Sequence, residues 1–72
     1  MKISYYPETN SLYIDLSDRL GDGSYEISTG MVLDYDADGN LTGIDIDQAS
    51  GKLNLTELEL HRFPAEIQRL SA

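Results

Sequence analysis

The chain has 72 residues, and its 13 acidic and 5 basic residues give a formal net charge of −8. This length predicts one domain, residues 1–72, near the lower size limit at which a hydrophobic core alone stabilises a fold. The absence of cysteine excludes disulfides, thiolate metal sites and a cysteine nucleophile. The acidic charge argues against nucleic-acid binding, which needs cationic side chains for the phosphates.

The N-terminal residues lack the apolar stretch of a signal peptide, and no apolar run approaches the length of a membrane-spanning helix. We therefore expect a cytoplasmic protein that does not bind membranes. Residues 1–51 carry the whole net charge of −8, whereas residues 52–72 are neutral overall. Solubility explains this acidic segment most simply, and attraction of a basic protein partner is the alternative.

Two segments near the N-terminus alternate with the period-two pattern of β-strands, residues 2–6 and residues 12–17. The Pro-Glu-Thr-Asn sequence between them has the composition of a turn. The register that pairs Tyr5 with Leu12 also sets Lys2 opposite Asp15, a cross-strand charge pair that favours it. The sequence therefore predicts a hairpin at residues 2–17.

A polar, glycine-bearing loop follows, and then a short candidate strand at residues 25–29. The next element is a hairpin at residues 31–47, because Asp38-Gly39 is a favoured pair for a two-residue type I′ turn with positive φ at both positions. This turn predicts three apolar cross-strand pairs on one face of the sheet: Met31 with Ile46, Leu33 with Ile44, and Tyr35 with Thr42.

The C-terminal tail, residues 52–72, has too many apolar residues for a disordered end: Leu53, Leu55, Leu58, Leu60, Phe63, Ile67 and Leu70. We expect it to cover the sheet. Thr56–Glu59 matches a capping box that would begin a helix at Glu57, although residues 53–60 also fit a strand. Pro64 fits the first turn of a second helix that ends at Leu70. The predicted fold is mainly β with a short helical C-terminal tail, a small α+β domain whose sheet is an antiparallel meander of four to five strands.

Residues 34–45 follow the pattern of an EF-hand calcium loop for most of its length. Asp34, Asp36 and Asp38 stand at positions one, three and five, and Gly39 stands at position six. However, Asp45 replaces the bidentate glutamate of position twelve, and the flanking residues are typical of strands rather than helices. Calcium binding by these four aspartates is the alternative to an ordinary hairpin turn.

No catalytic constellation is visible, and we expect neither enzymatic activity nor a cofactor. Asp34, Asp36 and Asp45 are predicted to share one sheet face, where mutual repulsion would raise a pKa, but that face should be solvated. His61 is the only histidine, and nothing in the spacing places a serine or threonine nucleophile beside it.

Two of the five tyrosines, Tyr6 and Tyr13, are predicted on the face of the sheet opposite the core. Because exposed tyrosine is enriched at protein interfaces, we predict an interface that contains Tyr6, Tyr13, Val32 and Leu41. The alternative is that these residues are scattered surface side chains that support their strands.

The first 17 residues contain Lys-Ile-Ser-Tyr, a Pro-Glu turn and Leu-Tyr-Ile-Asp-Leu-Ser, and they resemble the opening of the DUF2283 family. The resemblance continues through Gly30–Gly39, Leu41–Ile46 and Ala49-Ser50, and so covers residues 1–51. It implies a small, soluble prokaryotic domain of unknown function, and it supplies no catalytic residues. Some members resemble partners of small toxins, which implies an antitoxin-like role.

Taken together, the small size and the acidic charge favour a protein-interaction module. We expect it to form a homodimer or to bind a basic protein partner.

Overall fold

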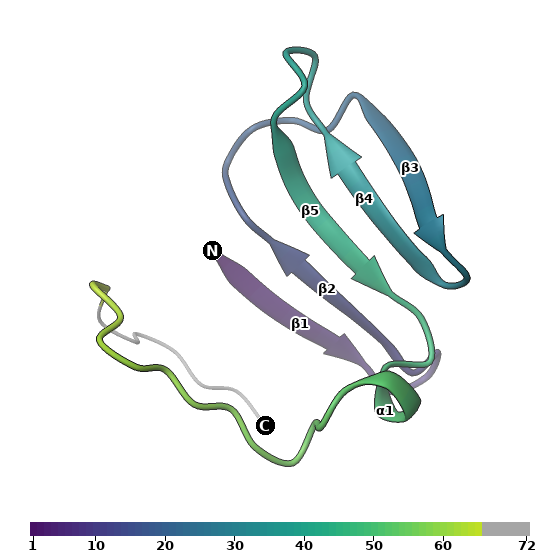
Figure 1. Ribbon diagram of the computed structural model, residues 1–72, viewed down its shortest axis with the longest axis vertical. Coiled ribbons are helices and arrows are strands. Elements are labelled where there is room, and N and C mark those ends of the chain that lie inside the picture. The colour runs from purple at the N-terminus through teal and green to yellow at the C-terminus, as the bar shows by residue number, and fades with distance from the viewer. Residues whose placement is uncertain (66–72) are drawn as a thin grey trace.

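The computed structural model describes residues 1–65, and its main element is one antiparallel sheet of five strands (Figure 1). One short helix follows the last strand. The elements in chain order are β1 (Lys2–Tyr6), β2 (Ser11–Asp15), β3 (Gly23–Ser28), β4 (Met31–Tyr35), β5 (Leu41–Ile46) and α1 (Ala49–Lys52). The predicted class, mainly β with a short helix, is confirmed.

The strand order in the sheet is β1-β2-β5-β4-β3. The sheet therefore consists of the hairpin β1–β2 and the three sequential strands β3–β4–β5, which are joined where β5 pairs with β2. The loop between β2 and β3 crosses the end of the sheet to join them (Figure 1). Its backbone is attached at both ends, because Leu16 N–H donates to the Thr42 carbonyl at 2.9 Å and Asp22 N–H donates to the Tyr35 carbonyl at 2.7 Å.

The first predicted hairpin is confirmed in register, with Tyr5 opposite Leu12 and Lys2 opposite Asp15. Its turn ends at Asn10, which takes a φ of 55°. Asparagine is among the few residues that tolerate this left-handed conformation.

The strands of the central hairpin also pair as predicted over most of their length. Two of the predicted pairs are present, Met31 with Ile46 and Leu33 with Ile44. The third is wrong, because the register shifts after Asp34 and Tyr35 pairs with Leu41 instead of Thr42. Thr42 is the extra residue of β5 at this irregularity, and it is buried.

The predicted type I′ turn at the tip of this hairpin is wrong. Gly39 has a φ of 84°, but Asp38 does not have a positive φ. Instead, Gly39 N–H donates to the Asp36 carbonyl at 3.1 Å, and Asp36 N–H donates to the Asn40 carbonyl at 2.9 Å. These bonds close a three-residue loop in which only the glycine is left-handed. An aspartate in that conformation would cost roughly 1–2 kcal/mol, which this loop avoids.

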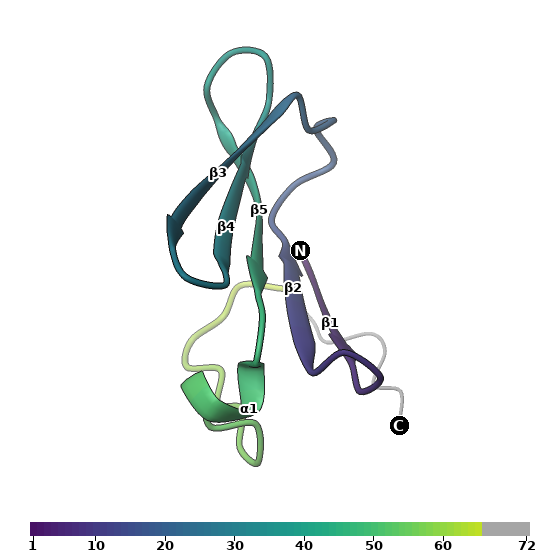
Figure 2. The same cartoon turned by 90° about the vertical axis from the view of Figure 1, so that its right-hand side faces the viewer.

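The pairings divide the sheet into two faces of different chemistry. The first, called here the apolar face, has no charged side chain: Ile3, Tyr5, Leu12, Ile14, Tyr25, Met31, Leu33, Ile44 and Ile46. The second, called here the acidic face, holds all the charges of these paired positions: Lys2, Asp15, Glu26, Asp34 and Asp45. Figure 2 shows the sheet nearly edge-on, as one twisted layer with α1 at one end.

The buried core is small and lies where α1 meets the apolar face. Its members are Leu12, Ile46 and Ala49, and Ala49 has no exposed surface. Asn10 attaches α1 to the first hairpin. Its carbonyl accepts from Ala49 N–H at 2.8 Å, and its side-chain oxygen accepts from Ser50 N–H at 3.1 Å and from the Tyr5 hydroxyl at 2.9 Å.

A second attachment of α1 comes from its last residue. The Lys52 ammonium donates to the Asp47 carbonyl at 2.6 Å and to the Thr29 carbonyl, at the β3–β4 turn, at 3.2 Å. A cation at the C-terminal end of a helix is also favoured by the helix dipole. Helix α1 is therefore attached to the β1–β2 hairpin through Asn10 and to the β3–β4 turn through Lys52.

The helix predicted from Glu57 is wrong, and residues 53–65 form neither helix nor strand. The Thr56 hydroxyl, which would cap the predicted helix, is bonded to Asn54 instead. The Asn54 side-chain oxygen accepts from both the backbone N–H and the hydroxyl of Thr56. An isolated helix this short would also be only marginally stable. Most of the second predicted helix, Pro64 to Leu70, lies outside the described residues.

Within residues 1–65, no helix is both long and apolar enough to cross a membrane.

Candidate functional site

The acidic face has an ordered centre, built from the four neighbouring strands β2, β5, β4 and β3. The ring of Tyr13, on β2, reaches over β5, and its hydroxyl donates to Oδ2 of Asp34, on β4, at 2.7 Å. The other carboxylate oxygen of Asp34 accepts from the Ser24 hydroxyl at 2.6 Å. Gly43 makes this crossing possible, because a Cβ there would come within 2.6 Å of Tyr13 Cζ and closer still to the hydroxyl oxygen.

These contacts change the acidity of Tyr13. The hydrogen bond to Asp34, followed by burial and the charges of Asp34, Asp15 and Asp45, raises the pKa of Tyr13 from 10.0 to about 12. The neutral phenol is therefore favoured in the folded protein. Its contribution to stability is fully present below the pKa of the unfolded chain and is lost as the pH rises from about 10 to about 12.

We predict that ultraviolet titration of the folded protein detects one tyrosine ionising near pH 12, and that Tyr13→Phe removes that step. Loss of a hydrogen bond to a charged acceptor should also lower the free energy of unfolding by about 1–2 kcal/mol at neutral pH. This difference should shrink between about pH 10 and pH 12, where wild-type Tyr13 itself ionises. An unchanged titration curve in Tyr13→Phe would contradict the assignment.

Asp45 lies beside this centre, opposite Tyr13 on β2 and Val32 on β4. Burial, followed by the charges of Asp47 and Asp34, raises the pKa of Asp45. The predicted repulsion is therefore seen at Asp45, where the charge of Asp34 adds to the effects of burial and Asp47 on the pKa. It does not extend to Asp36, which lies beyond the end of β4 in the hairpin loop.

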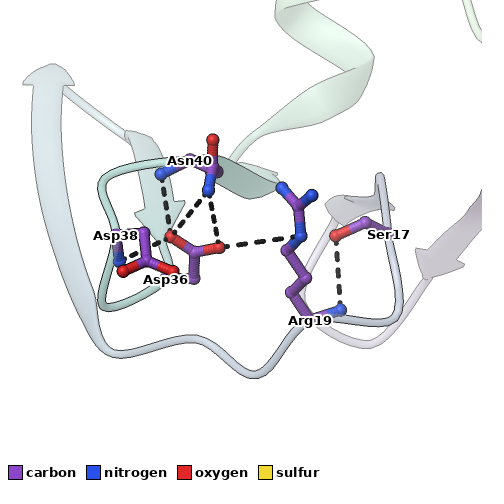
Figure 3. A network of polar contacts seen from close by, with 5 residues as sticks. All are labelled: Ser17, Arg19, Asp36, Asp38 and Asn40. Carbon is purple, nitrogen blue, oxygen red and sulfur yellow. Dashed lines mark hydrogen bonds and ion pairs between the residues drawn. The ribbon is translucent and has the colours of Figure 1, made fainter.

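Asp36 organises that loop (Figure 3). Its Oδ1 accepts from the N–H groups of Asp38, at 2.9 Å, and Asn40, at 2.8 Å, and its Oδ2 lies 3.8 Å from the Arg19 guanidinium. The backbone bond from Asn40 lowers the pKa of Asp36 most, against the opposite effect of burial, and the Asn40 side chain, Asp38 N–H and Arg19 add to the lowering. The carboxylate is thus already used to hold its own loop.

The structure does not bring the four predicted calcium ligands together. Asp34 and Asp45 share the acidic face, whereas Asp36 and Asp38 belong to the loop. Across residues 1–65, no three carboxylate or histidine side chains are placed to hold one metal ion. Calcium binding stays a prediction, and it would require the Asp36 contacts to rearrange.

His61 lies in the tail, and its Nε2 is 3.3 Å from the Glu59 carboxylate. Both side chains are mostly exposed. In the described part of the chain the side-chain hydrogen bond of His61 is to Glu59, and none joins it to a hydroxyl group that could act as a nucleophile.

The predicted interface residues have different environments. Tyr6 is 48% exposed on the acidic face, whereas the Tyr13 hydroxyl is bonded to Asp34. Val32 is half-buried on the acidic face, and Leu41 lies opposite Tyr35 at the irregularity of the hairpin. Tyr6, Tyr13 and Val32 thus share the acidic face, and the role of these four residues in binding stays a prediction.

The larger unexplained surface is the apolar face. Three of its side chains are exposed, Tyr25 at 66%, Ile3 at 47% and Tyr5 at 43%, and four more are only half-buried. The sequence assigns the apolar tail to cover this face. That assignment stays a prediction, and the tail residues Ile67 and Leu70 lie outside the described residues. The tail residues Leu58 and Phe63 are themselves exposed.

Comparison with protein families matches residues 2–50 to DUF2283, which is described as a protein of unknown function. The chain belongs to the DUF2283 family. The match covers β1 to β5 and the start of α1, and the tail lies beyond it. Comparison with curated proteins and with solved structures found no match.

Proposed function

We propose that this DUF2283 protein is a small acidic interaction module that associates through the apolar face of its sheet. The observation that carries the proposal is that the apolar face contains more apolar side chains than the fold buries. Of the nine residues of the apolar face, only Leu12 and Ile46 are buried; Ile14, Met31, Leu33 and Ile44 are half-buried, and Ile3, Tyr5 and Tyr25 are exposed. Contiguous apolar surface of this kind is typical of protein–protein contacts.

The fold also explains why association is favourable. A single sheet needs a second layer against its apolar side, and domains are built from at least two packed layers. In residues 1–65, α1 supplies such a layer only at one end, through Ala49. A partner that covers the remaining face would add the missing burial, at about 25 cal/mol per Å² of apolar surface.

Two kinds of partner fit this module, a second copy of the chain or another protein, including a basic one drawn by the net charge of −8. The antitoxin-like role implied by the resemblance is one form of the second kind. Neither the calcium alternative nor an enzymatic role is favoured by an observation of equal weight.

Affinity co-purification from cells at native expression level, in low salt, tests the proposal with two matched variants. Tyr25→Glu places a charge on the apolar face, and Tyr6→Glu places one on the acidic face. Both tyrosines are exposed and stand on edge strands. We expect a stoichiometric associated chain with wild type and with Tyr6→Glu, and its loss with Tyr25→Glu. Equal recovery with Tyr25→Glu, or no associated chain with wild type, would overturn the proposal.

A further inference from the structure

We infer that the occupant of the apolar face is a second copy of this chain, so that two sheets pack face to face with their acidic faces outward. This inference rests on the proposed function and names the partner for it. Three observations carry it: the chemistry of the apolar face, the segregation of charge between the two faces, and the accessible surface of the chain.

The apolar face is chemically suited to a copy of itself. It is made of aliphatic and tyrosine side chains and has no charged group for a basic partner to pair with. Cations brought against it would be buried without a counter-ion, which costs several kcal/mol per charge. A second apolar face brings no such charge, and a two-fold axis makes one patch complementary to itself.

Two chains of charge −8 repel each other, but the charged side chains of the sheet lie on the acidic face, away from the proposed contact. In a face-to-face arrangement the sheets lie about 10 Å apart, and the outward carboxylates of the two copies are separated by about 20 Å. This separation exceeds the screening length of about 8 Å at physiological ionic strength. Contact through the acidic face would instead bring Asp34 and Asp45 of both copies together.

The accessible surface of the chain is sufficient for a dimer interface. It measures 6040 Å². A compact monomer of the same mass, 8.0 kDa, is expected to expose about 4,450 Å², so the surplus is about 1,600 Å². A stable interface needs about 800 Å² from each partner. The open sheet face and the exposed tail together therefore supply enough surface.

The edges of the sheet are less suited to self-pairing. The outer strand β3 has an irregular register between Glu26 and Ser28, and the other outer strand, β1, carries Lys2. Bulges and edge lysines are common means of preventing edge-to-edge pairing. Association through a face is therefore favoured over extension of the sheet.

Sedimentation equilibrium of the full chain at low and high sodium chloride tests the inference through the sign of the salt effect. We expect a dimer whose dissociation constant falls, or stays constant, as salt screens the like charges. A complex with a basic partner would weaken with salt instead. Tyr25→Glu should raise the dissociation constant about tenfold or more, because the two-fold axis buries two new carboxylates. Tyr6→Glu should change it by less than about threefold.

Circular dichroism of both variants establishes that the sheet is retained. A folded wild-type chain that stays monomeric at millimolar concentration, or a dimer disrupted by Tyr6→Glu but not by Tyr25→Glu, would overturn the inference. If the chain is monomeric but still captures another protein in a Tyr25-dependent way, the inference fails and the proposed function stands. If that capture is also absent, both fail.

Discussion

Replacing Gly43 with alanine is expected to lower the free energy of unfolding by about 2 kcal/mol, the cost of overpacking together with a lost hydrogen bond to a charged group. The new Cβ would occupy the place of the Tyr13 ring, with Cζ only 2.6 Å away. The ring must swing out, which breaks its bond to Asp34. Urea denaturation measures the loss, and ultraviolet titration should show that the ionisation near pH 12 has disappeared.

Gly23→Ala is the matched control, because a Cβ added to this strand glycine would meet no heavy atom within 4 Å. We expect it to change stability by less than about 0.5 kcal/mol, as for surface substitutions in general. In a Tyr13→Ala background, Gly43→Ala should also become nearly neutral, because the clash is gone. A full cost of Gly43→Ala in that background would show that the clash with Tyr13 is not its cause.

Replacing Asn10 with alanine is expected to cost about 2–3 kcal/mol, from lost side-chain hydrogen bonds and a left-handed alanine. The Asn10 side chain bonds Tyr5 and the backbone and hydroxyl of Ser50, and so links the first hairpin to α1. Its φ of 55° adds a backbone cost for any residue with a Cβ. Thermal unfolding followed by circular dichroism measures the effect.

Asn10→Gly separates the two contributions, since glycine accepts the positive φ but also lacks the hydrogen bonds. We expect it to recover about 1 kcal/mol relative to alanine. Equal stability of the two variants would show that the backbone conformation adds no cost. Wild-type stability in both would refute the role of Asn10 as the link to α1.

The strands of this fold follow from local sequence patterns. Alternation of apolar residues determines the register of β1–β2, because a shift by one residue would turn every apolar side chain to the other face. Leu33 was placed opposite Ile44 from the position of the predicted turn, and this pair is present although the turn type is wrong. The loop and the irregularity at Thr42 offset each other, so that the pairing further along β4 and β5 is unchanged.

Local sequence patterns did not predict the structure of the tail or the contacts of the candidate site. The capping box at Thr56 was a local signal without the tertiary contacts that a short helix needs. The bond between Tyr13 and Asp34 depends on the pairing of β2 with β5, which no local pattern specifies. The exposure of Ile3, Tyr5 and Tyr25 on the apolar face was not predicted, since composition shows that a face needs a cover but not which segment provides it.

The most direct test of the central claim, that association covers the apolar face, is a methyl NMR spectrum with a soluble paramagnetic agent. We predict that in concentrated protein the Ile3 methyl groups, on the apolar face, are protected from broadening, and that dilution removes this protection. The Val32 methyl groups, on the acidic face, should not change with concentration. Ile3 signals that are broadened equally at all concentrations, in a chain with no other partner present, would contradict the claim.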